Sequence, residues 1–352
     1  MHVTGRRRLR SRCLALALCL VGTGCVASDS RSNVISTVTD REQWVIDVFD
    51  LIESRAYFSD RVDWTTRRSE VSRAANTGLI YSLVDDVIAD LADDHSRLLR
   101  PYQVAGVVES ELVLSTPAPT GDVIATNVGY LVLPAVGVGV ARDGDRMVSA
   151  ETPASATYVN AGRAVLTTHV DTCGWIIDLR GNRGGNALLM LSALAPLLGV
   201  GVVSRFRGRN GETSGITLDE RGMAHEVDGL NDNWNEPVPN PLSMAPVAIL
   251  TNGATASAAE AVAIAFVRRA GTRSFGAATQ GVPTAIEATF LSDGAVLALT
   301  VAVSVDRSGR LYKGPIVPDE PVVDPLGVPT ISDPSVSAAT TWLKFQTNCS
   351  TG

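Results

Sequence analysis

The chain divides into stretches that differ in the spacing of hydrophobic and polar residues. Between Arg41 and about Leu99, apolar residues recur every three or four positions, as they do in amphipathic helices. From position 129 onwards, short apolar runs such as 174–180 and 246–252 alternate with glycine turns and helical segments. Continuous apolar strands are typical of a parallel sheet that is covered on both faces. The pattern predicts an α/β fold, with a mainly parallel sheet and flanking helices, preceded by a small N-terminal helical subdomain.

Individual elements follow from the same pattern. The predicted elements are strands at 129–136, 174–180 and 246–252, helices at about 151–170 and 186–199, a strand and loop at 272–281, and a hairpin of 284–291 and 295–305. Residues 113–128, rich in Pro, Thr and Gly, fit either a loop or an edge strand. The carboxyl ends of parallel strands form one edge of a sheet, where binding sites are commonly found.

The first residues have the features of an export signal. A basic segment, MHVTGRRRLRSR, leads into 16 residues from Cys13 to Ser28 that carry no charge. This stretch is shorter than the about 20 residues of a transmembrane helix and matches a signal peptide. The residues V-G-T-G-C resemble a bacterial lipobox and favour lipidation of Cys25 and membrane anchoring. Cleavage after a small residue, with soluble secreted or periplasmic release, is the alternative.

These features give a domain organisation. The predicted segments are a signal peptide at 1–27, a linker at 28–39, a helical subdomain at 40–104, a connecting segment at 105–128, a core at 129–335, and a C-terminal helix and tail at 336–352.

Composition narrows the choice of partners. A net charge of −7 and a pI near 5.2 give no indication of a nucleic-acid partner. Outside the leader the chain keeps two cysteines, Cys173 and Cys349, which in an exported protein favour one disulfide. The sequence has no metal-ligand cluster of Cys and His and no phosphate-binding glycine fingerprint, so we expect no cofactor.

Ser257 stands between an apolar run and a helical segment. Together with Glu260 it forms S-x-x-E, the signature of a helix capping box, in which the serine satisfies a backbone N–H. A serine between a strand, a tight turn and a helix is also how hydrolases present a nucleophile. These residues alone leave both roles open.

A serine nucleophile needs a base nearby, and few residues of this chain can supply one. The chain has only two lysines, Lys313 and Lys344. Outside the leader, His169 precedes a strand and His225 lies in a polar loop, so we expect both to be non-catalytic. His95, in LADDHSRLL, remains. An exposed histidine that interacts with a helix end is the alternative for this residue.

The glycine turn GNRGG at 181–185 follows another apolar run. Glycines allow backbone N–H groups to approach a developing oxyanion closely, and one such donor lowers the barrier by roughly 3–4 kcal/mol. Many strand-to-helix turns contain glycines for conformational reasons alone, so this turn needs further support.

Five segments together resemble the tail-specific protease family (peptidase family S41), which includes the C-terminal processing peptidases and the tricorn core. They are LADDHSRLL, GWIIDLRGNRGGN, TNGATASAAEA, TRSFGAATQG and GPIVPDEPV. They are similar to the family's D-x-H-S, D-L-R-x-N-x-G-G, T-x-S-x-x-E, G-x-x-T-x-G and G-x-I-x-P-D segments. Their order and spacing agree over about residues 40–325.

The resemblance implies a Clp/crotonase-like core and a serine peptidase that acts on peptide or protein substrates without a cofactor. It implies that Ser257 is the nucleophile. It also implies that the N–H group of Ala258, together with that of Gly184 or Gly185, forms the oxyanion hole.

The sequence departs from the processing peptidases in two ways. Fewer than 30 residues separate the helical region from position 129, too few for the PDZ module of many relatives. The catalytic lysine of those enzymes is replaced by Val282, which excludes a Ser/Lys pair. The tricorn-like branch uses a histidine instead, which matches His95 as general base. That branch orients its histidine through a hydroxyl and a glutamate, for which Ser96 and Glu320 are the candidates.

The leading hypothesis is therefore an exported serine peptidase of the tail-specific type. The alternative is a catalytically weakened or inactive, surface-anchored peptide-binding module on the same fold, which the missing lysine and the unassigned acid favour. A crotonase-type acyl-CoA enzyme is disfavoured by export and by the lack of a lysine near the core. The sequence leaves the substrate and the oligomeric state open.

Overall fold

The computed structural model describes residues 35–104, 117–124, 127–137, 139–150, 152–231, 237–323 and 333–346. The predicted leader at 1–27, Cys25 and Cys349 lie outside these residues. Contacts between Cα atoms group residues 33–352 into one compact unit. Among the described residues, no helix has the length and apolar character needed to cross a membrane.

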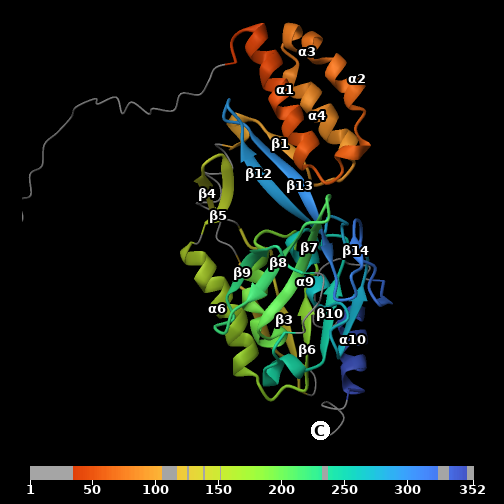
Figure 1. Ribbon diagram of the computed structural model, residues 1–352. Helices are drawn as coiled ribbons and strands as arrows, with labels where there is room; N and C mark the ends of the chain where they lie inside the picture. The colour runs from red at the N-terminus through yellow and green to blue at the C-terminus, as the bar shows by residue number, and fades with distance from the viewer. Residues whose placement is uncertain are drawn as a thin grey trace, which may run out of the picture. The chain divides into compact units, whose positions relative to one another are not determined.

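The apolar runs of the sequence form the strands of a six-stranded sheet (Figure 1). Its strands, in spatial order, are β15 (Glu320–Pro321), β11 (Thr272–Gly276), β10 (Val247–Thr251), β6 (Gly174–Asp178), β3 (Val128–Val132) and β2 (Thr120–Ile124). All pairs are parallel except β2 with β3. β2 is thus an edge strand, which decides between a loop and an edge strand for residues 120–124 of the stretch 113–128. Every residue of the central strands β6 and β10 is buried, as predicted from their uninterrupted apolar character.

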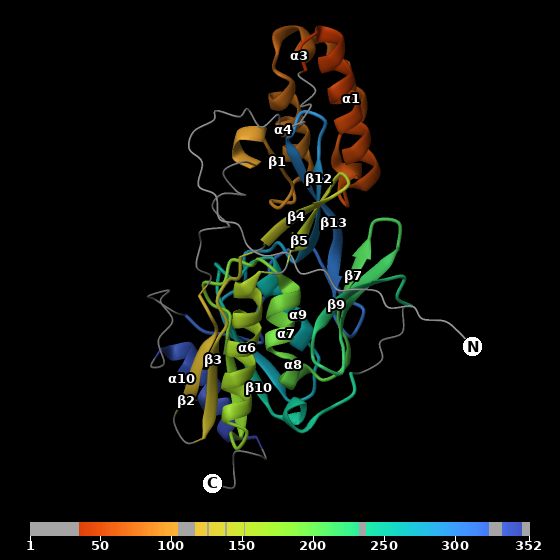
Figure 2. The ribbon, with the colours of Figure 1, turned by 90° about the vertical axis from the view of Figure 1, so that its left-hand side faces the viewer.

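Helices cover both faces of this sheet, as Figure 2 shows for α6 and α7 on one side and α10 on the other. Helices α6 (Pro153–Thr168), α7 (Ala187–Ala193), α8 (Ala195–Leu198) and α9 (Ala258–Phe266) lie on the first face. α10 (Pro334–Lys344) lies on the second. Because side chains alternate along a strand, Trp175 and Ile177 pack with the first group while Ile176 packs with α10.

A second, antiparallel sheet of nine strands was not predicted from the sequence, apart from one hairpin. Its main path is β4 (Gly139–Asp143), β5 (Arg146–Ala150), β12 (Thr284–Phe290), β13 (Val296–Val305), β7 (Gly201–Gly208), β8 (Thr213–Leu218) and β9 (Ala224–Asp228). β1 (Arg97–Leu99) and β14 (Leu311–Tyr312) pair with β13. The prediction of a mainly parallel sheet therefore holds for only one of the two sheets. Arginines and glycines interrupt the apolar pattern of β7 and β8, and His225 lies in β9 rather than in a loop.

The N-terminal helices are α1 (Val38–Arg55), α2 (Trp64–Ser69), α3 (Val71–Thr77) and α4 (Ile80–Leu91), with a short 3-10 turn, η1, at Ser59–Arg61. Their apolar faces share one core with β13, where Phe49 and Ile52 join Leu297 and Leu299. After α4 the chain enters β1, which pairs antiparallel with β13. This pairing carries the segment around residue 95 from the helical region to the antiparallel sheet.

Candidate active site

Ser257 occupies a strained turn between β10 and α9. Its backbone has φ 54° and ψ −118°, a conformation that non-glycine residues rarely adopt. Holding such a residue costs about 1–3 kcal/mol, and strain of this kind concentrates at functional sites. A sharp strand-to-helix turn of this type exposes the serine hydroxyl above the sheet in hydrolases. The Glu260 N–H donates to the backbone carbonyl of Ser257 at 2.9 Å, and the Glu260 carboxylate accepts from the Ser257 N–H in return.

Glu260 holds this turn through a buried carboxylate. Its Oε2 accepts hydrogen bonds from the N–H groups of Ser257 (2.8 Å) and Val282 (2.9 Å). Its Oε1 accepts from the Thr279 hydroxyl (2.5 Å) and the Gly281 N–H (2.9 Å). Burial raises the pKa of Glu260, while these four hydrogen bonds act in the opposite direction. The carboxylate half of the capping box therefore serves a second purpose, because it ties the serine to the loop that leads into β12.

The glycine turn after β6 lies directly against the serine turn. The Ala256 N–H donates to the Asn182 carbonyl (3.0 Å), and the Thr255 hydroxyl donates to the Leu179 carbonyl (2.9 Å). Gly184 has φ 100°, and a Cβ added there would lie 2.9 Å from the Cβ of Ser257. Only glycine fits this close approach, which explains on steric grounds why the turn has a glycine at position 184.

The two glycines differ as oxyanion donors. The Gly184 N–H donates to the side chain of Asn182 (2.9 Å), so it is already engaged. The N–H groups of Gly185 and Ala258 remain as the candidate pair, with Gly185 after the turn and Ala258 directly after the serine. The geometry thus favours Gly185 over Gly184 for this role.

His95 precedes β1, and its imidazole is held by Thr284 at the start of β12. The Nδ1 atom lies 2.6 Å from the Thr284 hydroxyl oxygen. When Nδ1 carries the proton and donates it to this oxygen, Nε2 is unprotonated and available as a base. Burial, and secondarily the nearby charge of Arg97, lowers the pKa of His95 to about 4, whereas Asp93 acts to raise it. His95 is therefore neutral at physiological pH.

The structure assigns other contacts to the two residues expected to orient the histidine. The Ser96 hydroxyl donates to Asp93 (2.6 Å) and accepts from the Thr300 N–H (2.9 Å), which pins the start of β1 to β13. Glu320 lies in β15 and pairs with Arg273 at 3.3 Å. Neither side chain hydrogen-bonds to the His95 imidazole, and the hydroxyl that does so belongs to Thr284. The sequence carries no signal for this contact, because 189 positions separate the two residues.

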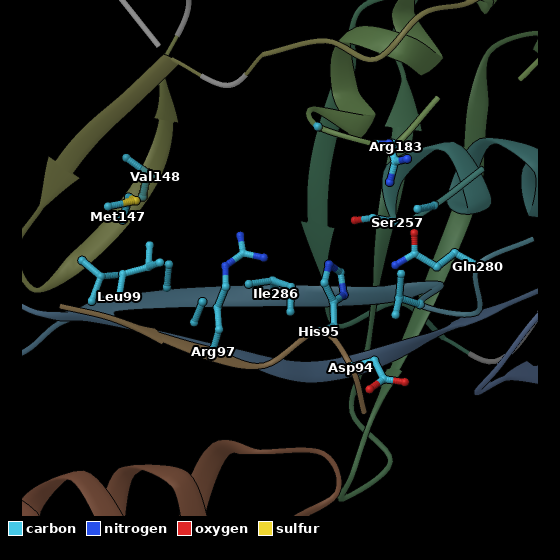
Figure 3. Close-up of a pocket in the computed structure, with 16 residues that line it drawn as sticks. Asp94, His95, Arg97, Leu99, Met147, Val148, Arg183, Ser257, Gln280 and Ile286 are labelled. Carbon is cyan, nitrogen blue, oxygen red and sulfur yellow. The ribbon is translucent and has the colours of Figure 1, made fainter. Parts of the chain in front are cut away.

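His95 and Ser257 line the same pocket, with a volume of about 730 Å³. Figure 3 shows the imidazole and the serine hydroxyl pointing toward one another, with Gln280 beside them. Apolar side chains from β1, β5, β12 and β13 form much of the wall, and Arg97 and Arg183 also face the cavity. A second pocket of about 350 Å³ also reaches Ser257, and Phe206, Ile216 and Leu188 are among its lining residues.

A buried ionic cluster stabilises the end of β6 next to the glycine turn. The Arg180 guanidinium donates to both carboxylate oxygens of Asp178 (2.9 and 2.7 Å) and pairs with Asp333 at 2.7 Å. Asp333 caps α10, and Tyr130 donates to Asp178 at 2.5 Å. This cluster gives the D-L-R segment a structural role, because it joins the sheet to the helix beneath it.

Cys173 forms a disulfide in the structure. Its predicted partner, Cys349, lies outside the described residues, so the pairing with Cys349 stays a prediction.

Together, the fold and the site define an α/β protein with a strained serine turn, a glycine turn and a neutral histidine around one pocket. Residues 127–322 match the model of peptidase family S41. The chain belongs to peptidase family S41, and this membership indicates a serine-type peptidase.

One curated relative is the nisin-resistance protein of Lactococcus lactis subsp. lactis, which is 31% identical over 149 residues. The match covers 42% of this chain and 45% of the relative, so the chain spans less than half the length of that protein.

Solved structures share the fold at lower identity. A lipoprotein from Streptococcus agalactiae has a TM-score of 0.66 and 22% identity, over 86% of this chain and 96% of that one. The photosystem II D1 C-terminal processing protease has a TM-score of 0.54 and 16% identity, over 82% of this chain and 94% of that one.

Proposed function

We propose that the protein is an exported serine peptidase in which Ser257 is the nucleophile and His95 the general base. The observation that carries the proposal is one pocket that both a strained serine and a neutral histidine, held by Thr284, line. A hydroxyl needs such a base to become nucleophilic, and a histidine with a low pKa is available for proton transfer at neutral pH.

The reaction follows from the positions of these groups. Ser257 Oγ attacks the peptide carbonyl carbon as His95 Nε2 takes its proton, and Gly185 and Ala258 donate to the oxyanion. His95 then gives the proton to the leaving amine, which leaves an acyl-enzyme. Water, activated by the same histidine, hydrolyses the ester and regenerates the serine. In this scheme Nδ1 carries a proton and donates it to the Thr284 hydroxyl, so that Nε2 exchanges the proton with the substrate.

A fluorophosphonate probe tests this proposal directly. We expect covalent labelling of the wild-type protein and none of Ser257→Ala, with Ser54→Ala, an exposed helical serine, labelled like the wild type. Nisin is the first peptide to test, because the relative bears its name. Labelling that survives in Ser257→Ala would rule out this serine as the nucleophile.

A peptide-binding module without activity is the second candidate. It is supported by the partner of His95, which is a neutral hydroxyl rather than the carboxylate of a Ser-His-Asp triad. Such a module would bind peptides, stay unlabelled by the probe and release no cleavage products.

Export and anchoring belong to the same proposal, and the lipoprotein neighbour supports them. Full-length protein should fractionate with membranes, and Cys25→Ser should lose the lipid and the membrane association. Recovery of the wild-type protein in the cytoplasm would contradict export.

A further inference from the structure

Two arginines face the pocket beside Ser257 without an ion-pair partner. Arg97 begins β1 and Arg183 lies in the glycine turn, and both are exposed. Within the described ranges, neither guanidinium forms an ion pair or hydrogen bond with the protein, unlike Arg180 nearby. In Figure 3 the Arg183 guanidinium lies next to Ser257, and that of Arg97 points into the pocket.

The rest of the pocket leaves these two charges uncompensated. Among its described lining residues Asp94 is the single acidic one, and in Figure 3 its carboxylate lies on the side of His95 that faces away from Ser257. The wall is otherwise apolar or neutral, with Met147 and Ile286 among its members. A cavity with two positive charges over an apolar wall attracts an anion next to apolar side chains.

The position of His95 tells which part of a peptide this pocket receives. The general base must pass its proton to the leaving amine, so it lies on the leaving-group side of the scissile bond. His95 lines the pocket that contains the two arginines and is not among the lining residues of the smaller pocket. Among the described lining residues of the smaller pocket, the carboxylates of Glu226, Asp228 and Glu287 outnumber the one arginine, Arg146, so the charge there repels an anion.

We infer that Arg97 and Arg183 bind a carboxylate of the peptide segment that leaves as the amine product. This inference rests on the proposed peptidase function and names its substrate class: peptides with a carboxylate shortly after the scissile bond. The carboxylate is either the α-carboxylate of the peptide's C-terminus or a side chain of Asp or Glu. Guanidinium groups bind both through charge-assisted, often bidentate hydrogen bonds.

Binding to the inactive Ser257→Ala protein tests the inference without catalysis. The probe is a random nonapeptide library prepared as free acids and as C-terminal amides, with bound peptides quantified by mass spectrometry. We expect about tenfold preference for free acids, or the same enrichment of Asp and Glu in both forms. The first result identifies the α-carboxylate and the second a side chain. Equal retention of all peptides would overturn the inference.

Charge-removing variants then assign the preference to the two arginines. In the Ser257→Ala background, Arg97→Gln and Arg183→Gln should each reduce the preference several-fold, and the double variant should abolish it. Arg221→Gln, which removes an exposed arginine of the β8–β9 turn, is the matched control and should keep it. Selection that persists in the double variant would assign the carboxylate to other residues.

Cleavage of the same library by the wild-type protein separates the two proposals. Products that depend on Ser257 and carry the carboxylate in the leaving segment support both. If no peptide is cleaved while arginine-dependent selection persists in binding, the peptidase proposal fails and the carboxylate site remains. If peptides are cleaved without selection, the peptidase stands and the inference is wrong.

Discussion

The nucleophile and the base of the candidate site are held in very different ways. Ser257 sits in a turn whose backbone is tied down by the buried carboxylate of Glu260 and by the adjoining glycine turn. The His95 backbone N–H donates to the neighbouring Asp93 carboxylate, but the imidazole itself is held by a hydrogen bond with Thr284, which is distant in sequence. The residue before His95, Asp94, has a φ of 53°, so the backbone leading to the histidine is itself unusual.

Because of this difference, substitutions around the serine and around the histidine should affect different properties of the protein. Bonds around the nucleophile also hold β6, β10 and α9 together, so that changes there affect the fold. The histidine partner lies at the start of an antiparallel strand and orients one ring, so that changes there affect mainly proton transfer. A neutral hydroxyl also stabilises an imidazolium less than a carboxylate does, which favours a slower peptidase than a complete triad would give.

The largest effect is expected when either the nucleophile or the base is removed. Ser257→Ala and His95→Ala should each lower kcat/KM by at least about a thousandfold, because the hydroxyl and its base act as one unit. The double variant should be no worse than either single one. Peptide hydrolysis measures this, and His225→Ala, in the exposed strand β9, is the control. Substantial activity in His95→Ala would assign the base elsewhere.

Next in size, Glu260→Gln should damage both fold and activity. The amide keeps one oxygen and presents N–H in place of the other, so it leaves unpaired either the N–H groups of Ser257 and Val282 or that of Gly281. We expect a loss of about 2–4 kcal/mol in the free energy of unfolding, seen as a lower Tm, together with weaker hydrolysis. A wild-type Tm would show that the turn does not depend on this carboxylate.

On the base side, Thr284→Val should lower kcat by roughly ten- to a hundredfold through loss of ring orientation, with little change in Tm. Thr284→Ser, which keeps the hydroxyl, should restore most of the rate. Measuring Tm and kcat for both variants compares the two sides of the site: Glu260→Gln should lower both quantities, and Thr284→Val mainly kcat. Failure of serine to rescue would mean that Thr284 acts by packing rather than by its hydrogen bond.

The same contrast explains what the sequence could predict. The serine turn and the glycine turn are each formed by residues that lie within a few positions of one another in the sequence. Both were therefore found from the sequence. Glu260 was recognised as a helix cap, but its bonds to Gly281 and Val282 depend on how the following loop folds back.

The base side depends on pairing between distant segments. His95 remained as a candidate after the other histidines were set aside, and the family resemblance gave it the role of base. Thr284 was missed because threonine is common in strands and 189 positions separate it from the histidine. The antiparallel sheet was missed for a related reason. Strands β7 and β8 carry arginines and glycines, and their burial arises from packing in the folded protein rather than from a continuous apolar run.

The smallest predicted effect is a shift in the pH profile. Hydrolysis requires neutral His95, and burial lowers its pKa to about 4, so kcat/KM should stay level below pH 6 and fall near pH 4. Arg97 contributes to the lowered pKa, so Arg97→Gln should move this acidic limb to higher pH, and Arg221→Gln should not.

The same lowered pKa affects folding stability. An unfolded histidine titrates near pH 6.5. Between pH 6.5 and 4 the unfolded chain therefore binds more protons than the folded one, and the contribution of His95 to stability is lost as the pH falls through this window. His95→Ala should remove that part of the pH dependence of Tm. An acidic limb near pH 6.5 in the wild type would instead indicate a solvated imidazole that its hydrogen bond with Thr284 does not hold in place.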